Sequence, residues 1–202
     1  MTAQNIADIG VQLGRLVADF ARVERVPRWA DNQHETDVEH SYLLALVACE
    51  LAAAYYPELQ TGLIAEFANV HDLVEVKVGD TPTFLATPEQ LDEKIVREHA
   101  ALRELQAELP SHTVEMLTRY EEQHEPEARF VKVVDKMTPA IVNIVSGNLR
   151  PMYEDYAIHT SEEFLETANH RDTILAEKYP DFPEIVEACR LLHQQFSMAF
   201  DK

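Results

Sequence analysis

The chain has 202 residues, 46% of them hydrophobic, and a formal net charge of -19. This length fits one globular domain with a sizeable core, so we expect residues 1–202 to form a single domain. The charge excludes a broad basic face, and hence a nucleic acid polymer as partner. No apolar run approaches the roughly 18 residues of a membrane span, so we expect no contact with a membrane.

Helices are favoured over strands because the chain has only 5 glycines and 10 prolines and long stretches rich in Ala, Leu, Glu and Val. We expect an all-α fold of eight to nine helices, divided by Pro and Gly. Their expected ranges are 3–24, 36–56, 61–72 with a short continuation at 75, 87–109, 112–123, 126–149, 161–178 and 183–200. Residues 28–35 are expected to form a loop and residues 79–82 a turn. The first helix is expected to bury Ile6, Ile9, Leu13, Leu16, Val17 and Phe20.

The two cysteines indicate a reducing compartment. Cys49 and Cys189 lie among helix-forming residues and form no CxxC pair, which favours reduced, buried thiols. Residues 1–20 lack the charged n-region and cleavage site of a signal peptide. These features predict a cytoplasmic protein.

Four side chains of metal-ligating type lie on helix faces that are otherwise apolar. His40 and Asp135 each share a face with core residues; a lone inward His is usually a core residue, but a buried carboxylate without a cation is unfavourable. A metal that joins the two explains both. His71 and Asp72 are neighbours about 100° apart on a helix, which lets both reach one ion at the helix end. This mixed nitrogen and oxygen set predicts one divalent ion, Mn, Co, Fe, Ni or Zn, with Mg less favoured.

Glu75 and Asp80 are candidates for contact with a substrate. Glu75 lies one turn after the His71-Asp72 pair, so it either moves protons as a general acid or base or is an exposed helix residue. The adjacent pair favours catalysis. Asp80 either contacts a ribose hydroxyl or caps the turn, and the sequence leaves both interpretations open.

A cluster of arginines suits a phosphate clamp. Arg22, Arg25 and Arg28 fall within seven positions, although cations also suit the dipole of a helix C-terminus. A dianionic phosphate that enters a pocket of carboxylates needs a fixed cation besides the metal. Arg25 is the candidate because it precedes Pro27, which directs the chain at the exit of the first helix.

The run HDLVEVKVGDTPT, residues 71–83, resembles the HD-x-x-E-V-x-x-G-D-x-P-T signature of the YfbR-like 5'-deoxynucleotidases, which are HD-domain metal-dependent phosphohydrolases. Residues 38–41, VEHS, are similar to the setting of the first metal histidine in that family. Residues 127–136 resemble the last ligand helix of a related branch. The resemblance spans about residues 22–138.

This resemblance implies an all-helical HD-domain bundle that holds one divalent metal through His40, His71, Asp72 and Asp135. It also implies hydrolysis of a nucleoside 5'-monophosphate to nucleoside and phosphate. Relatives are commonly homodimers, which the apolar surplus of the last helices would permit.

By position, the resemblance assigns phosphate binding to Arg25, catalysis to Glu75 and sugar contact to Asp80. One residue departs from the pattern. The family has Trp directly after this arginine, where it helps to exclude ribonucleotides, and this chain has Val26. Trp29 could substitute, and selectivity for deoxyribose stays open.

Three other functions compete with this one. A two-metal HD phosphodiesterase or oxygenase needs extra histidines between the HD pair and Asp135; His99, His112 and His124 occupy that interval without a clear pattern. A nucleoside triphosphate hydrolase is a further enzyme hypothesis. A non-catalytic nucleotide-binding module would need no proton shuttle, which argues against it.

Overall fold

The computed structural model describes residues 2–201, and it confirms the expected all-α fold. The helices in this range are α1 (Ala3–Phe20), α2 (Asp37–Tyr55), α3 (Thr61–Val70), α4 (Glu75–Val78), α5 (Pro88–Glu108), α6 (Ser111–Glu122), α7 (Pro126–Ser146), α8 (Ser161–Lys178) and α9 (Pro183–Ser197). A π-helical turn η1 (Pro151–Asp155) and two short strands, β1 (Glu24–Arg28) and β2 (His34–Thr36), complete it. Within these residues no helix is both long and apolar enough to cross a membrane.

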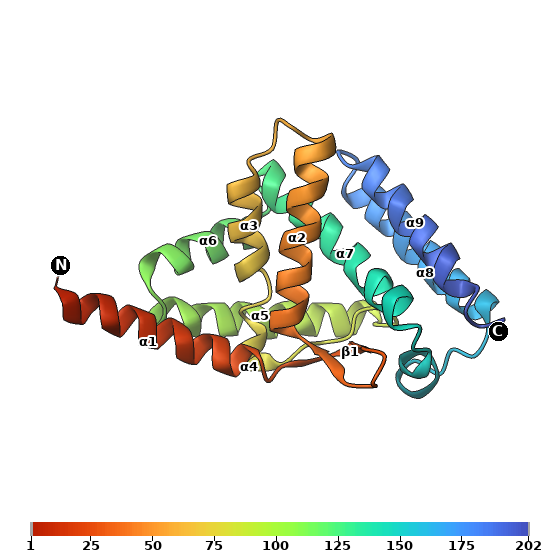
Figure 1. Ribbon diagram of the computed structural model, residues 1–202, viewed down its shortest axis with the longest axis horizontal. Coiled ribbons are helices and arrows are strands. Elements are labelled where there is room, and N and C mark those ends of the chain that lie inside the picture. The colour runs from red at the N-terminus through yellow and green to blue at the C-terminus, as the bar shows by residue number, and fades with distance from the viewer. Residues whose placement is uncertain (1, 202) are drawn as a thin grey trace.

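Helix α7 runs through the middle of the molecule and packs against α2, α3, α6 and α9 (Figure 1). On one side α2 and α3 pack against each other and against α7, and on the other side α9 lies between α7 and α8. Fully buried side chains such as Leu44, Phe67 and Phe130 form the main core between α2, α3 and α7. The ligand-type residues of the sequence lie on these central helices.

Helix starts follow local signals. Thr36 Oγ1 accepts the backbone N–H of Glu39, whose carboxylate accepts the N–H of Thr36 at 2.8 Å, and this capping box begins α2. Thr87 and Thr160 cap α5 and α8 in the same way. The predicted starts of these helices are therefore confirmed to within a residue or two.

The predicted first helix and the loop after it are wrong in part. Helix α1 ends at Phe20, and residues that were assigned to its end and to the loop form an antiparallel hairpin of β1 and β2. Val26 is β-branched and Pro27 cannot continue a helix, which suits a strand once a partner strand lies beside it. The hairpin carries Arg25 over the start of α2.

The expected buried stripe of α1 is also wrong. Ile6, Ile9 and Val17 are 62%, 47% and 51% exposed, and only Phe20 of the stripe is buried. Figure 1 shows the reason: α1 points away from the bundle, with the N-terminus at its far end. Its apolar spacing is helical, but no other helix of the described chain covers its N-terminal half.

Candidate metal centre

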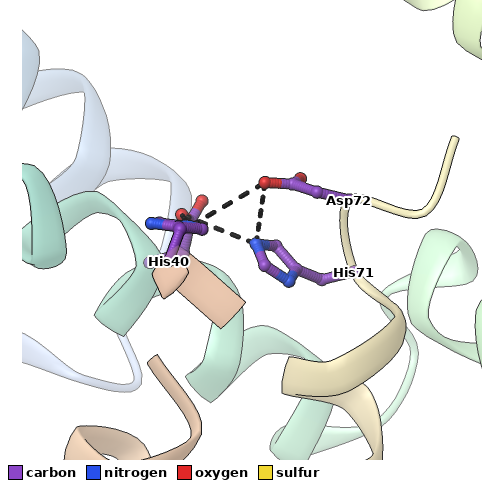
Figure 2. A group of neighbouring side chains, drawn as sticks. His40, His71 and Asp72 are labelled. Atoms are coloured by element: carbon purple, nitrogen blue, oxygen red, sulfur yellow. Dashed lines mark hydrogen bonds and ion pairs between the residues drawn. The ribbon is translucent and has the colours of Figure 1, made fainter. Parts of the chain in front are cut away.

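Four ligand-type side chains from α2, α7 and the end of α3 converge on one point. His40 lies in the first turns of α2, and His71 and Asp72 follow the last residue of α3 (Figure 2). Asp135 comes from the middle of α7. One nitrogen or oxygen atom of each residue lies within 4.8 Å of those of the other three. The structure thus brings together the four predicted metal ligands.

The spacing of these atoms suits a transition metal. Nε2 of His40 lies 3.0 Å from Oδ1 of Asp135, and Nε2 of His71 lies 2.9 Å from Oδ2 of Asp72. The cross distances, His40 to Asp72 and His71 to Asp135, are 3.8 and 3.9 Å. Metal bonds of about 2.1 Å put neighbouring ligands roughly 3.0 Å apart at a right angle and roughly 3.4 Å apart in a tetrahedron. The four atoms therefore fit around one ion.

Both imidazoles turn Nε2 towards this point. Nδ1 of His71 donates to the carbonyl of Ala68 at 2.8 Å, which leaves Nε2 as the acceptor. Nε2 is buried, and its contact with Oδ2 of Asp72 at 2.9 Å does not have the geometry of a hydrogen bond. Such an unpaired buried lone pair fits a metal ligand. Burial, and then the charge of Arg25, lowers the pKa of His40 to about 4, so the ring of His40 is neutral at physiological pH.

The backbone of α7 is adapted at Asp135. Pro139 lies inside the helix and has no N–H to donate to the carbonyl of Asp135 four residues earlier. Thr138 Oγ1 donates to this carbonyl instead, at 2.7 Å. Lys136 holds Oδ2 of Asp135 at 2.7 Å, so that Oδ1 faces His40. Burial raises the pKa of Asp135, but Lys136 and His40 outweigh it and hold this pKa well below its usual range.

Arg25 lies in a ring of carboxylates beside the centre. Its Nη1 is 2.9 Å from Oδ2 of Asp72 and 3.0 Å from Oδ1 of Asp37. The other carboxylates within 4.0 Å of the guanidinium belong to Glu35, Glu75 and Asp80. Nη2 has no hydrogen bond to any described residue and is not fully buried. The Nη2 edge of the guanidinium is therefore available to donate to an anion.

The other two arginines of the predicted clamp point elsewhere. Arg22 is exposed and pairs with Asp19 at 2.7 Å. Arg28 is buried and pairs with Glu154 and Asp155 of η1, both at 2.6 Å. Of the three, only Arg25 reaches the centre, and it does so from strand β1 instead of from the exit of the first helix, where it was expected.

Glu75 opens α4 and is buried, with an exposed fraction of 2%. The alternative of an exposed helix glutamate is therefore wrong. Lys94 of α5 lies 3.1 Å from its Oε1, and Nη1 of Arg25 lies 3.7 Å from its Oε2. Burial, followed by the charges of Asp72 and Asp80, raises the pKa of Glu75 to about 10. These surroundings favour the protonated form of this carboxyl.

Residues 20–178 match the family model of the HD domain. The chain belongs to the HD-domain family. A solved structure from Magnetospirillum magnetotacticum MS-1, described as a predicted metal-dependent phosphohydrolase, is 20% identical, with a TM-score of 0.68 over 95% of this chain and 94% of that one. A conserved hypothetical protein from Pyrococcus furiosus is 23% identical, with a TM-score of 0.59 over 89% and 98%. These two show the shared fold. No curated protein matches.

Asp80 lies at the rim of the HD-domain centre. It follows Gly79, whose φ of 72° and ψ of 161° are open only to glycine. Its Oδ1 is 4.0 Å from Nη1 of Arg25, and burial raises its pKa. A cavity of about 610 Å³ adjoins Glu75, Gly79 and Asp80 and is bounded on its other side by the end of α1. This volume is in the usual range for small-molecule sites.

Sequence reasoning missed three groups of the HD-domain centre. Asp37 fell at the expected start of the second helix, and Glu35 fell in the expected loop; both side chains are fully buried. Oε2 of Glu35 lies 3.8 Å from Nδ1 of His40, where it can orient the ring. Lys94 is the third. The acidic spacing of residues 35, 37 and 39 was the available signal for the first two, whereas Lys94 is brought in by packing alone.

The histidines expected of a two-metal HD protein do not reach this centre. His112 pairs with Glu66 and its side chain is 68% exposed, and that of His124 is 82% exposed. His99 is exposed as well. The part of the chain that the structure describes therefore offers these three no role as ligands.

Proposed function

We propose that this HD domain is a metal-dependent phosphohydrolase that removes the 5'-phosphate from deoxynucleoside or ribonucleoside monophosphates. The observation that carries the proposal is the convergence of His40, His71, Asp72 and Asp135 on one point beside buried Glu75 and Arg25. The description of the similar Magnetospirillum structure supports a phosphohydrolase. The motif of residues 71–83 supports a nucleotide as substrate.

The four ligands would hold one divalent ion, which would polarise the phosphate and lower the pKa of water. Two carboxylates and two neutral imidazoles carry a charge of about -2, which balances the ion. Nitrogen donors favour Mn, Co, Fe, Ni or Zn over Mg. Lys136 keeps Asp135 ionised and Glu35 faces the far nitrogen of His40, so both contacts preserve the donor set.

Arg25 would bind the phosphate through Nη2. Its Nη1 is already held by Asp37 and Asp72, which fixes the plane of the guanidinium before substrate enters. A fixed, planar donor binds phosphate with little loss of side-chain entropy. In a chain of charge -19, this cation also offsets repulsion between the phosphate and the carboxylate ring.

Glu75 would exchange protons at the reacting phosphate. In its protonated state it can give a proton to the 5'-oxygen while a water oxygen bonds to phosphorus and the bond from phosphorus to the 5'-oxygen breaks, so that the nucleoside leaves neutral. A cation beside Asp72 lowers the pKa of Glu75 from about 10 towards neutrality. Lys94 fixes its position from α5. Asp80, at the rim, would contact the sugar.

The test is a phosphate-release screen of the purified chain against deoxy- and ribonucleoside mono-, di- and triphosphates, with Mn, Co, Ni, Zn and Mg in turn. We expect turnover of monophosphates with a transition metal and its loss in Glu75→Gln. Turnover of triphosphates alone would favour a triphosphate hydrolase. Binding of nucleotide without any turnover would favour a non-catalytic module.

A further inference from the structure

A loop of residues 79–87 connects α4 to α5 and contains neither helix nor strand (Figure 1). It carries Asp80, the carboxylate at the rim of the HD-domain centre. Between residues 79 and 87 the backbone makes one hydrogen bond of its own, from the N–H of Ala86 to the carbonyl of Thr83 at 3.3 Å. A segment with so few internal backbone bonds needs contacts from elsewhere to keep one conformation.

Arg171 of α8 supplies such contacts to the backbone of the loop. Its Nε donates to the carbonyl of Phe84 at 3.0 Å. Its Nη2 donates to the carbonyl of Ala86 at 3.0 Å and to that of Thr83. One guanidinium therefore satisfies three carbonyls within residues 83–86, far away in the sequence. The planar fork of donors makes this possible, and a lysine ammonium cannot reproduce it.

The partners of Arg171 are backbone carbonyls and not carboxylates. Within residues 2–201, every acceptor of its hydrogen bonds belongs to this loop. Its side chain is half-buried, and burial lowers its pKa below the usual range. Hydrogen bonds from a cation are stronger than those between neutral groups, so the charge of Arg171 tightens its hold on the loop. By contrast, Arg97 of α5 reaches the loop only at the side chain of Thr81, at 3.0 Å.

Aromatic packing anchors the same part of the loop to α8. The ring of Phe84 stacks on that of Phe164, a buried residue of α8, with centroids 5.7 Å apart. On its other side it contacts the ring of Tyr156, which follows η1, at 5.4 Å. Phe84 thus fixes the loop through its side chain, and Arg171 fixes it through the backbone.

We propose that Arg171 is a positioning residue, which holds residues 79–87 in the conformation that places Asp80 beside the HD-domain centre. Its effect on catalysis rests on the proposed function, in which Asp80 contacts the sugar. At the other end of the loop, the N–H of Gly79 donates to the carbonyl of Glu75 at 2.7 Å. Asp80 therefore lies between two fixed points, and Pro82 restricts the chain between them. A loop ordered in advance binds nucleotide without the entropy cost of ordering.

The experiment combines amide hydrogen exchange of the full chain with a double-mutant cycle. Arg171→Ala should speed exchange in residues 79–87 and leave the metal content unchanged. It should raise KM for nucleoside monophosphates roughly 10- to 100-fold, the scale of one hydrogen bond to a charged group. In an Asp80→Asn background the same change should raise KM little further, because Arg171 acts through Asp80. A purely structural role would give equal effects in both backgrounds.

Arg190→Ala is the matched control, because Arg190 pairs with Glu187 on the surface of α9 at 3.2 Å; exchange and KM should stay at their wild-type values. Unchanged exchange in Arg171→Ala would overturn the proposal, as would equal effects on KM in the two backgrounds. If Arg171→Ala does not fold, Arg171→Lys decides: it should show the same changes to a smaller extent, and wild-type exchange and KM would overturn the proposal. Absence of turnover in the wild type would contradict the proposed function, while exchange would still show whether Arg171 holds the loop.

Discussion

Loss of the divalent ion from the HD-domain centre should lower the melting temperature of this protein by several degrees. Six carboxylates lie at the point where the four ligands meet or beside the guanidinium of Arg25, and none of their side chains is more than 15% exposed. They belong to Glu35, Asp37, Asp72, Glu75, Asp80 and Asp135. The cations paired with them are Arg25, Lys94 and Lys136. Removal of two positive charges therefore leaves the carboxylates of Asp72 and Asp135, whose pKa values are lowered, close together without the ion.

The magnitude follows from linkage between binding and folding. An ion at a thousand times its dissociation constant stabilises the folded state by about 4 kcal/mol. For a chain of this length, each kcal/mol shifts the melting temperature by roughly 2–4 °C, which gives roughly 8–16 °C. We expect Asp135→Asn to lose most of this ion-dependent shift, because it removes one ligand and one negative charge.

The assay is thermal unfolding of chelator-dialysed protein with and without Mn²⁺. Asp181→Asn is the matched control, since Asp181 is exposed and pairs with Arg129 on the surface. The quantity compared is the Mn²⁺-dependent shift of each variant. A shift in Asp135→Asn as large as in the wild type and in Asp181→Asn would remove Asp135 from the metal site.

Three further outcomes follow from the site. Glu75→Gln should keep the Mn²⁺-dependent shift but lose roughly 10² to 10⁴ in turnover of nucleoside monophosphates. The surface variant Glu66→Gln should keep both the shift and the turnover, and equal turnover in the two variants would exclude Glu75 from catalysis. Arg25→Lys should raise KM, and Arg25→Ala should raise it further, by about 1.5–3 kcal/mol of binding. The KM of Arg22→Ala should change little. Steady-state kinetics in which Arg22→Ala raises KM and Arg25→Ala does not would refute the role of Arg25 in phosphate binding. Burial raises the pKa of Glu35 from 4.5 to about 8, so in chelator its stabilising contribution is complete below pH 4.5 and is lost as pH rises through 8. Denaturant unfolding of Glu35→Gln should show a flatter pH dependence over that window, and an unchanged slope would contradict this account.

The sequence alone determined the features that depend on neighbours along the chain. Thr36 and Glu39 specify the start of α2 through contacts three residues apart, and Pro126 and Gly147 bound α7. The same locality allowed the ligand hypothesis. His71 and Asp72 are adjacent, and inward positions for His40 and Asp135 follow from helical spacing, so their convergence could be anticipated before the packing was known.

Tertiary structure alone decided which faces are covered and which distant groups meet. The apolar spacing of α1 predicts a helix correctly, but no local signal shows that the bundle leaves Ile6 and Ile9 exposed. The hairpin that carries Arg25 forms because residues 24–28 find a partner strand, a pairing that depends on context more than on propensity. Lys94 meets Glu75 for a similar reason: α5 folds back over α4, and such long-range contacts leave no periodic trace in the sequence.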